Sequence, residues 1–142
     1  MFKFKIFGFL ITLAFIAYSL NALNVEASGG APPPNPTIYT GTITIAGQTP
    51  VDSEFVLEGV RRRCLEGCIT ARLGSFVSDG GIVENGSYVL TFGPPDATLV
   101  NSAITFHYDG VVKADQEDLF LLSPSIRTVP NYNLTFPALP AP

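Results

Sequence analysis

The stretch Thr37-Ile38-Tyr39-Thr40-Gly41-Thr42-Ile43-Thr44-Ile45 has a period of two residues, and this period decides the fold class. Tyr39, Ile43 and Ile45 alternate with threonines, which gives one apolar face and one hydroxyl face. Similar alternation recurs as far as residue 136, and no stretch after residue 27 keeps a helical period for three turns. The pattern predicts an all-β chain of short strands.

Further runs repeat this alternation along the chain. Their predicted inward residues are Phe55, Leu57 and Gly59; Ile69, Ala71 and Leu73; Tyr88, Leu90 and Phe92; Ile104, Phe106 and Tyr108; and Tyr132, Leu134 and Phe136. We expect a core with one residue from each of six strands: Ile43, Leu57, Leu73, Leu90, Phe106 and Leu134. Gly74 is interpreted as a bulge or kink, Asp109-Gly110 as a hairpin turn before a short strand at 111–114, and 115–118 as an acidic loop. About seven short strands separated by turn residues predict an antiparallel two-sheet β-sandwich.

The N-terminal segment has the parts of a secretory signal peptide. Lys3 and Lys5 precede an apolar run over 6–20, and Val25 and Ala27 suit a cleavage site after residue 27. The alternative is an uncleaved helical membrane anchor, since about 20 apolar residues can span a bilayer. We expect a signal-peptide helix over 1–27, a Gly/Pro-rich leader over 28–36, a β-sandwich domain over 37–136 and a Pro-rich tail over 137–142. The predicted location is secreted or extracytoplasmic.

The charge balance argues against nucleic acid as a partner. Residues 28–142 contain six basic and eleven acidic side chains, a net charge of −5. Such a surface repels phosphate backbones. The cluster Arg61-Arg62-Arg63 is the local exception, and it is either a solvated hairpin tip or a contact for an anion, a polyanion or another partner.

Cys64 and Cys68 are the only cysteines, and an exported chain favours a disulfide between them. Their spacing does not fit a Cys-x-x-Cys redox motif, and a metal site would need two more ligands. Closing so short a loop stabilises the fold by about 2 kcal/mol. The disulfide should fix a hairpin tip rather than hold the core.

No group of residues predicts catalysis, a cofactor or a metal. His107 lies on the outward phase, and no nucleophile is near it in sequence. Asp115, Glu117 and Asp118 could offer oxygen ligands to Ca²⁺, but three acidic residues more often mark a soluble loop. Asn85 and Asn133 begin triplets of the N-glycosylation pattern. The chain has no Trp, and the four tyrosines after residue 27 fall on the inward phase, so a sugar-stacking platform is missing.

Three segments resemble carboxypeptidase regulatory-like (transthyretin-like, or prealbumin-like) β-sandwich domains. They are 39–45 with Gly47, 85–92 with its Gly-Ser-Tyr start, and 104–111. The resemblance implies seven strands in two sheets and a non-catalytic accessory role. Related hydrolases use several histidines, whereas this chain has one. Related adhesins form Lys–Asn isopeptide bonds, for which Lys113 and Asn133 are the conceivable pair.

These observations together predict a secreted, non-enzymatic module with a structural or protein-interaction role. The alternative is an extracellular carbohydrate- or ligand-binding module of the adhesin type. The expected partner is an extracellular protein or a glycan. Contact with a membrane is expected only through an uncleaved signal sequence.

Overall fold

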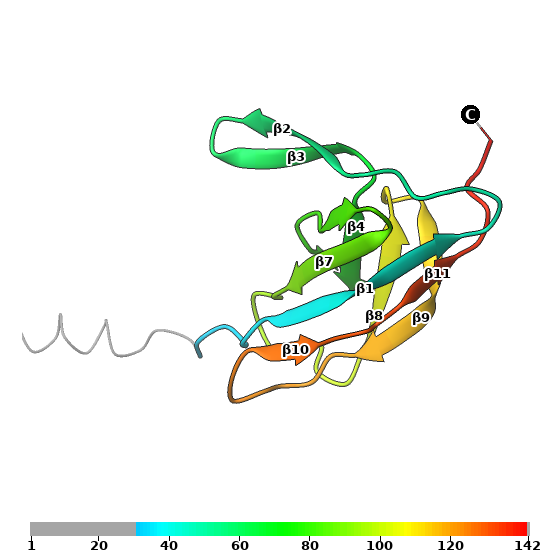
Figure 1. The fold of residues 1–142 in the computed structure, drawn as a ribbon. Helices are drawn as coiled ribbons and strands as arrows, with labels where there is room; N and C mark the ends of the chain where they lie inside the picture. The colour runs from blue at the N-terminus through cyan, green and yellow to red at the C-terminus, as the bar shows by residue number, and fades with distance from the viewer. Residues whose placement is uncertain (1–30, 142) are drawn as a thin grey trace, which may run out of the picture. The chain divides into compact units, whose positions relative to one another are not determined.

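A computed structural model describes residues 31–141 as an all-β fold (Figure 1). The predicted signal peptide lies outside these residues. The described part contains no helix long and apolar enough to cross a membrane. The strands are β1 (Thr37–Ile45), β2 (Glu54–Glu58), β3 (Arg61–Glu66), β4 (Ile69–Leu73), β5 (Phe76–Val77), β6 (Ile82–Glu84), β7 (Ser87–Phe92), β8 (Ala103–Tyr108), β9 (Val112–Leu119), β10 (Arg127–Val129) and β11 (Leu134–Phe136). The prediction of about seven strands was therefore too low.

Strand β1 is the centre of a five-stranded sheet with the order β10-β1-β7-β6, and β11 also pairs with β1. β7 runs antiparallel to β1, but β10 and β11 run parallel to it. The prediction of a purely antiparallel arrangement is therefore wrong. Gly41 lies between the two parallel partners, where a Cβ atom would be 2.5 Å from the Tyr132 carbonyl oxygen. Glycine at this position lets the chain pass close to β1.

A second sheet has the order β5-β4-β8-β9, with antiparallel pairing throughout. The Asp109-Gly110 turn joins β8 to β9, as predicted, with positive φ at both residues. Gly74 does not form a bulge. It begins the two-residue turn between β4 and β5, with φ of 57°, which suits a hairpin with glycine at its first turn position.

The predicted acidic loop over 115–118 is also wrong, because these residues belong to β9. β9 continues to Leu119, where it pairs with Ala103. The acidic side chains are tolerated in a strand because β9 is the last strand of its sheet, and charged residues are common on such edges.

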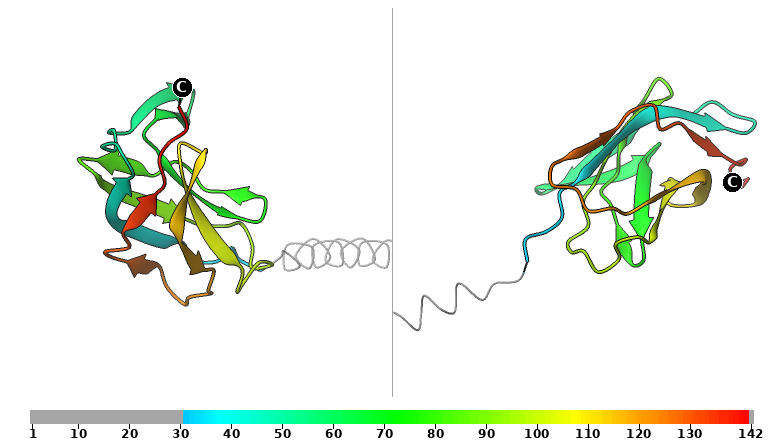
Figure 2. Two further views of the ribbon diagram at one scale, coloured as in Figure 1. Left: turned by 90° about the vertical axis from the view of Figure 1, so that its right-hand side faces the viewer. Right: turned by 90° about the horizontal axis from the view of Figure 1, so that it is seen from below.

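The two larger sheets share one hydrophobic core, and Figure 2 shows β8 and β9 on the opposite side of the core from β1. The predicted core residues Ile43, Leu73, Leu90, Phe106 and Leu134 are all at most 5% exposed. Leu57 is the exception, with 74% of its surface exposed. Its placement in the core was wrong because β2 belongs to neither of the two larger sheets.

Candidate functional site: the β2–β3 arm

Strands β2 and β3 form a hairpin, here called the arm, that pairs with no other strand of the described chain. Figure 1 shows the arm standing apart from the body of the fold. A two-residue turn at Gly59-Val60 closes it, with φ of 65° at the glycine. Leu57 and Val60 are largely exposed, and Leu65 is half exposed. An isolated two-stranded hairpin has little stability of its own, so its base must hold it.

The three predicted contact arginines are the first residues of β3, and Arg61 pairs with Glu58 beside the turn that closes the arm, so the cluster begins at the tip of this hairpin. They point alternately to the two faces of the arm. On one face, Arg63 forms an ion pair with Glu58 at 3.2 Å. On the other, the guanidinium carbon of Arg62 lies 4.1 Å from the centre of the Phe55 ring.

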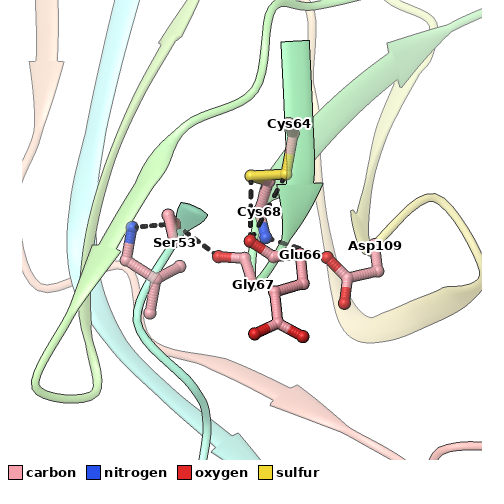
Figure 3. Close-up of a disulfide and its surroundings, with 7 residues drawn as sticks. Ser53, Cys64, Glu66, Gly67, Cys68 and Asp109 are labelled. Carbon is pink, nitrogen blue, oxygen red and sulfur yellow. Dashed lines mark hydrogen bonds between the residues drawn. A yellow bond between two sulfur atoms is a disulfide. The ribbon is translucent and has the colours of Figure 1, made fainter. Parts of the chain in front are cut away.

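Hydrogen bonds attach the base of the arm to the body (Figure 3). The Ser53 hydroxyl donates to the Gly67 carbonyl at 2.5 Å and accepts from the Val83 amide at 2.7 Å. The Cys68 amide donates to the Asp109 carboxylate at 2.9 Å. A Cβ atom at Gly67 would lie 2.7 Å from the Asp52 carbonyl oxygen. Only glycine therefore fits at this position, where the segment after β3 passes close to the segment before β2.

A disulfide joins Cys64 to Cys68, with 6.3 Å between their Cα atoms (Figure 3). This separation is within the normal range for a disulfide. The bond connects β3 to the residue before β4, so it reinforces the base of the arm and not, as predicted, a hairpin tip. Cys68 is buried, and a Cβ atom at Gly80 would lie 3.4 Å from Phe55 and 3.5 Å from Cys68. The loop around Gly80 therefore packs against the disulfide and against the Phe55 face of the arm.

A groove separates β3 from the body of the fold. It consists of two adjoining cavities of 460 and 550 Å³, both lined by Arg62, Asp79 and Gly80. The larger is also lined by Val60 and Arg61 at the end of the arm. The remaining residues of the smaller cavity are Phe76, Val77, Ser78, Gly81, Ile82, Val89, Thr91 and Gly93. Each volume lies in the range of pockets that hold small ligands or short peptide segments.

His107 lies on the outward phase of β8, as predicted, and is partly exposed. Its Nε2 is 2.9 Å from the Thr105 hydroxyl. Partial burial lowers the pKa of His107 below its ordinary value, and the charges of Arg72 and Lys113 lower it further. Residues 31–141 contain no group of three His, Cys, Asp or Glu side chains placed to hold a metal ion.

Two acidic residues of β9 form hydrogen bonds or ion pairs with other side chains of the fold. Asp118 accepts a hydrogen bond from Tyr39 at 2.9 Å and pairs with Arg127 at 3.4 Å. Glu117 forms an ion pair with Lys113. Asp115 is exposed.

Asn85 and Asn133 occupy different environments. Asn85 is exposed in the tight turn between β6 and β7. The Asn133 side-chain oxygen accepts from the Thr42 amide at 3.0 Å. The Lys113 ammonium thus contacts Glu117 and the Asn133 side chain contacts Thr42, so the two side chains are not paired with each other as an isopeptide bond would require.

Comparison with protein-family models, with curated proteins and with solved structures finds no match to this chain.

Proposed function

We propose that this protein is an extracytoplasmic, non-catalytic β-sandwich module that contacts another protein through the β2–β3 arm. The sandwich assignment is supported by two sheets that share a core and by the resemblance to carboxypeptidase regulatory-like domains. The location is supported by the disulfide, because disulfides persist in oxidising compartments.

The observation that carries this proposal is a projecting arm that exposes apolar residues among arginines and is held at its base by hydrogen bonds and a disulfide. Leu57 lies on the same face as Arg62, its cross-strand neighbour, and is 74% exposed. Exposed apolar clusters rimmed by charge are typical of protein contact surfaces. Because Ser53, Gly67 and the disulfide hold the base, the arm presents these side chains in one orientation.

The positions of the reactive residue types support a non-catalytic role. Hydrolytic catalysis needs a nucleophile, a base within hydrogen-bonding reach and a group that stabilises developing charge. His107 contacts a threonine hydroxyl, and both cysteines are in the disulfide. In β9, Glu117 and Asp118 are engaged in ion pairs.

A photo-crosslinking experiment in the producing cells tests the proposal. A photoreactive amino acid at Leu57 should capture a discrete protein partner, whereas one at Ile126, an exposed residue just before β10 at the far end of the fold from the arm, should not. Charge reversal of Arg61, Arg62 and Arg63 to Glu should abolish capture, and His107→Ala should leave it unchanged. Capture that is equal at both positions, or loss of capture in His107→Ala with the fold intact, would contradict the proposal. Glycan-array binding that is insensitive to the arginine reversal would instead favour a carbohydrate-binding module.

A further inference from the structure

Arg62 is held in place with its hydrogen-bond donors unused by any carboxylate. Its guanidinium lies over the Phe55 ring at 4.1 Å, which restricts its conformational freedom. The ion pairs among residues 31–141 are Arg63–Glu58, Lys113–Glu117 and Arg127–Asp118, so Arg62 is in none of them. An arginine stacked in this way has a planar edge that can bind a carboxylate with two hydrogen bonds.

The side of β3 away from β2 offers main-chain hydrogen bonds at the same place. Glu58 and Arg61 flank the two-residue turn, so they form a hydrogen-bonded pair. Hydrogen-bonded and non-hydrogen-bonded pairs alternate along an antiparallel ladder, so Val56 and Arg63 form the next hydrogen-bonded pair. The backbone groups of Arg62 and Cys64 therefore point away from β2. Arg61 and Arg62 of β3 line the groove and no residue of β2 does, so the groove lies on the β3 side of the arm.

The floor of the groove is apolar. Ile82 and Val89 are cross-strand neighbours on the outer face of β6 and β7, and they are 44% and 51% exposed. Val77, half exposed in the short edge strand β5, lines the same cavity. We call Val77, Ile82 and Val89 the groove floor.

We propose that the groove binds an extended segment of a partner protein that adds as a strand to the free edge of β3. A residue of this segment opposite Arg62 places its carboxylate on the guanidinium. Residues two positions away on the same face place aliphatic side chains on the groove floor, because side chains in a strand alternate between faces. This inference rests on the proposed function and adds the chemistry of the partner: an alternating strand with an acidic residue between two aliphatic ones.

Charge complementarity favours this occupant over a neutral or basic one. Arg61 and Arg62 both line the groove, and Asp79 is its one acidic residue. The unused backbone edge of β3 favours a peptide over a glycan, because a peptide strand can match its donors and acceptors in register.

Isotope-labelled protein titrated with the peptide Ile-Thr-Glu-Thr-Ile, blocked at both ends, provides the test. Low-millimolar peptide should shift the amide resonances of Arg62, Cys64, Val77, Ile82 and Val89. Arg62→Ala should weaken binding at least about tenfold, since a charge-assisted hydrogen bond is lost. Arg63→Ala is the matched control, because Arg63 pairs with Glu58 on the opposite face.

Two further comparisons test the strand geometry. The peptide with Lys in place of Glu, or with N-methyl groups on every backbone nitrogen, should bind much more weakly. Val89→Thr should weaken binding, whereas Val111→Thr, on the β8–β9 turn, should not. No resonance shifts with the acidic peptide, or equal binding by Arg62→Ala, would overturn this inference. Shifts caused only by a sulfated oligosaccharide would also overturn it. If the crosslink at Leu57 persists while the peptide fails, the arm remains a contact surface and only the strand-addition mode is wrong.

Discussion

The hydroxyl of Tyr39 donates a 2.9 Å hydrogen bond to the carboxylate of Asp118, and the same oxygen lies 3.4 Å from a guanidinium nitrogen of Arg127. These residues belong to β1, β9 and β10. β1 and β10 are neighbours in one sheet and β9 lies in the other, so this polar contact connects the two sheets. The Tyr39 side chain is buried and packs edge-on against Phe106 at 5.0 Å. Its hydroxyl therefore needs the carboxylate as a partner.

Asp118→Ala should lower the free energy of unfolding by about 2 kcal/mol, because it leaves a buried hydroxyl unpaired. Asp115→Ala is the control on the same strand, and we expect a change within about 0.5 kcal/mol because Asp115 is exposed. Urea unfolding of both variants provides the measurement. Equal losses would show that the Tyr39–Asp118 contact contributes nothing specific.

The tyrosines make the fold sensitive to alkaline pH. Burial raises the pKa of Tyr39 well above its ordinary value, and the hydrogen bond to Asp118 raises it further. Burial likewise raises the pKa of Tyr88. A folded state that holds these protons more tightly than the unfolded chain is stabilised below the ordinary pKa of 10.0 and loses that stability as pH rises above it.

We therefore expect tyrosinate absorbance of these residues to appear together with unfolding in an alkaline titration. Far-UV circular dichroism recorded in parallel tests this coupling. Tyr39→Phe should remove part of the absorbance change at the transition. Gradual ionisation of Tyr39 near pH 10 in a folded protein would contradict the expectation.

The alternation of residue types identified the buried residues wherever a strand reaches the core. The alternation correctly identified Ile43, Leu90 and Phe106 as buried, because their strands have one solvent-exposed face and one buried face. It failed for Leu57, since alternation shows which residues share a face but not whether anything covers that face. Gly59 was assigned to the strand interior, although its positive φ makes it the turn residue of the arm.

Other features had no local signal in the sequence. Arg127-Thr128-Val129 has no apolar alternation, and β10 forms because it pairs in parallel with the exposed edge of β1. Asp118 looked like a loop residue, yet it is held in β9 by Tyr39, 79 positions earlier in the chain. The groove brings Arg62 near Ile82 and Val89, an arrangement that depends on tertiary structure alone.

The two phases of the core strands should differ sharply in their response to truncation. Phe106→Ala or Leu90→Ala should cost about 2–5 kcal/mol, because both side chains are fully buried. Thr42→Ala, at an exposed position, should cost far less, and so should Leu57→Ala on the arm. Denaturant unfolding of the four variants tests the assignment. A cost for Leu57→Ala equal to that for Leu90→Ala would place the arm inside the cooperative core.

His107 should make the protein less stable in mild acid. Its pKa in the folded state is below the ordinary value of 6.5, so the unfolded chain binds more protons below that pH. The free energy of unfolding should then decrease as pH falls from 6.5 toward the folded pKa. His107→Gln keeps a hydrogen-bonding side chain beside Thr105 and should flatten this dependence. An unchanged slope in urea unfolding across this range would show that another group is responsible.

Loss of the disulfide should affect the arm more than the core. The double variant Cys64→Ser, Cys68→Ser should fold with a loss of about 2 kcal/mol, since the closed loop is short. Ser53 and Gly67 still connect the base, but the contact of the disulfide with Phe55 and the Gly80 loop is lost. Amide hydrogen exchange should therefore accelerate across 54–66 beyond the global change, whereas β7 and β8 should follow global stability. Exchange that rises equally everywhere would mean that the disulfide supports the whole fold, and the arm would then not be a separately anchored element.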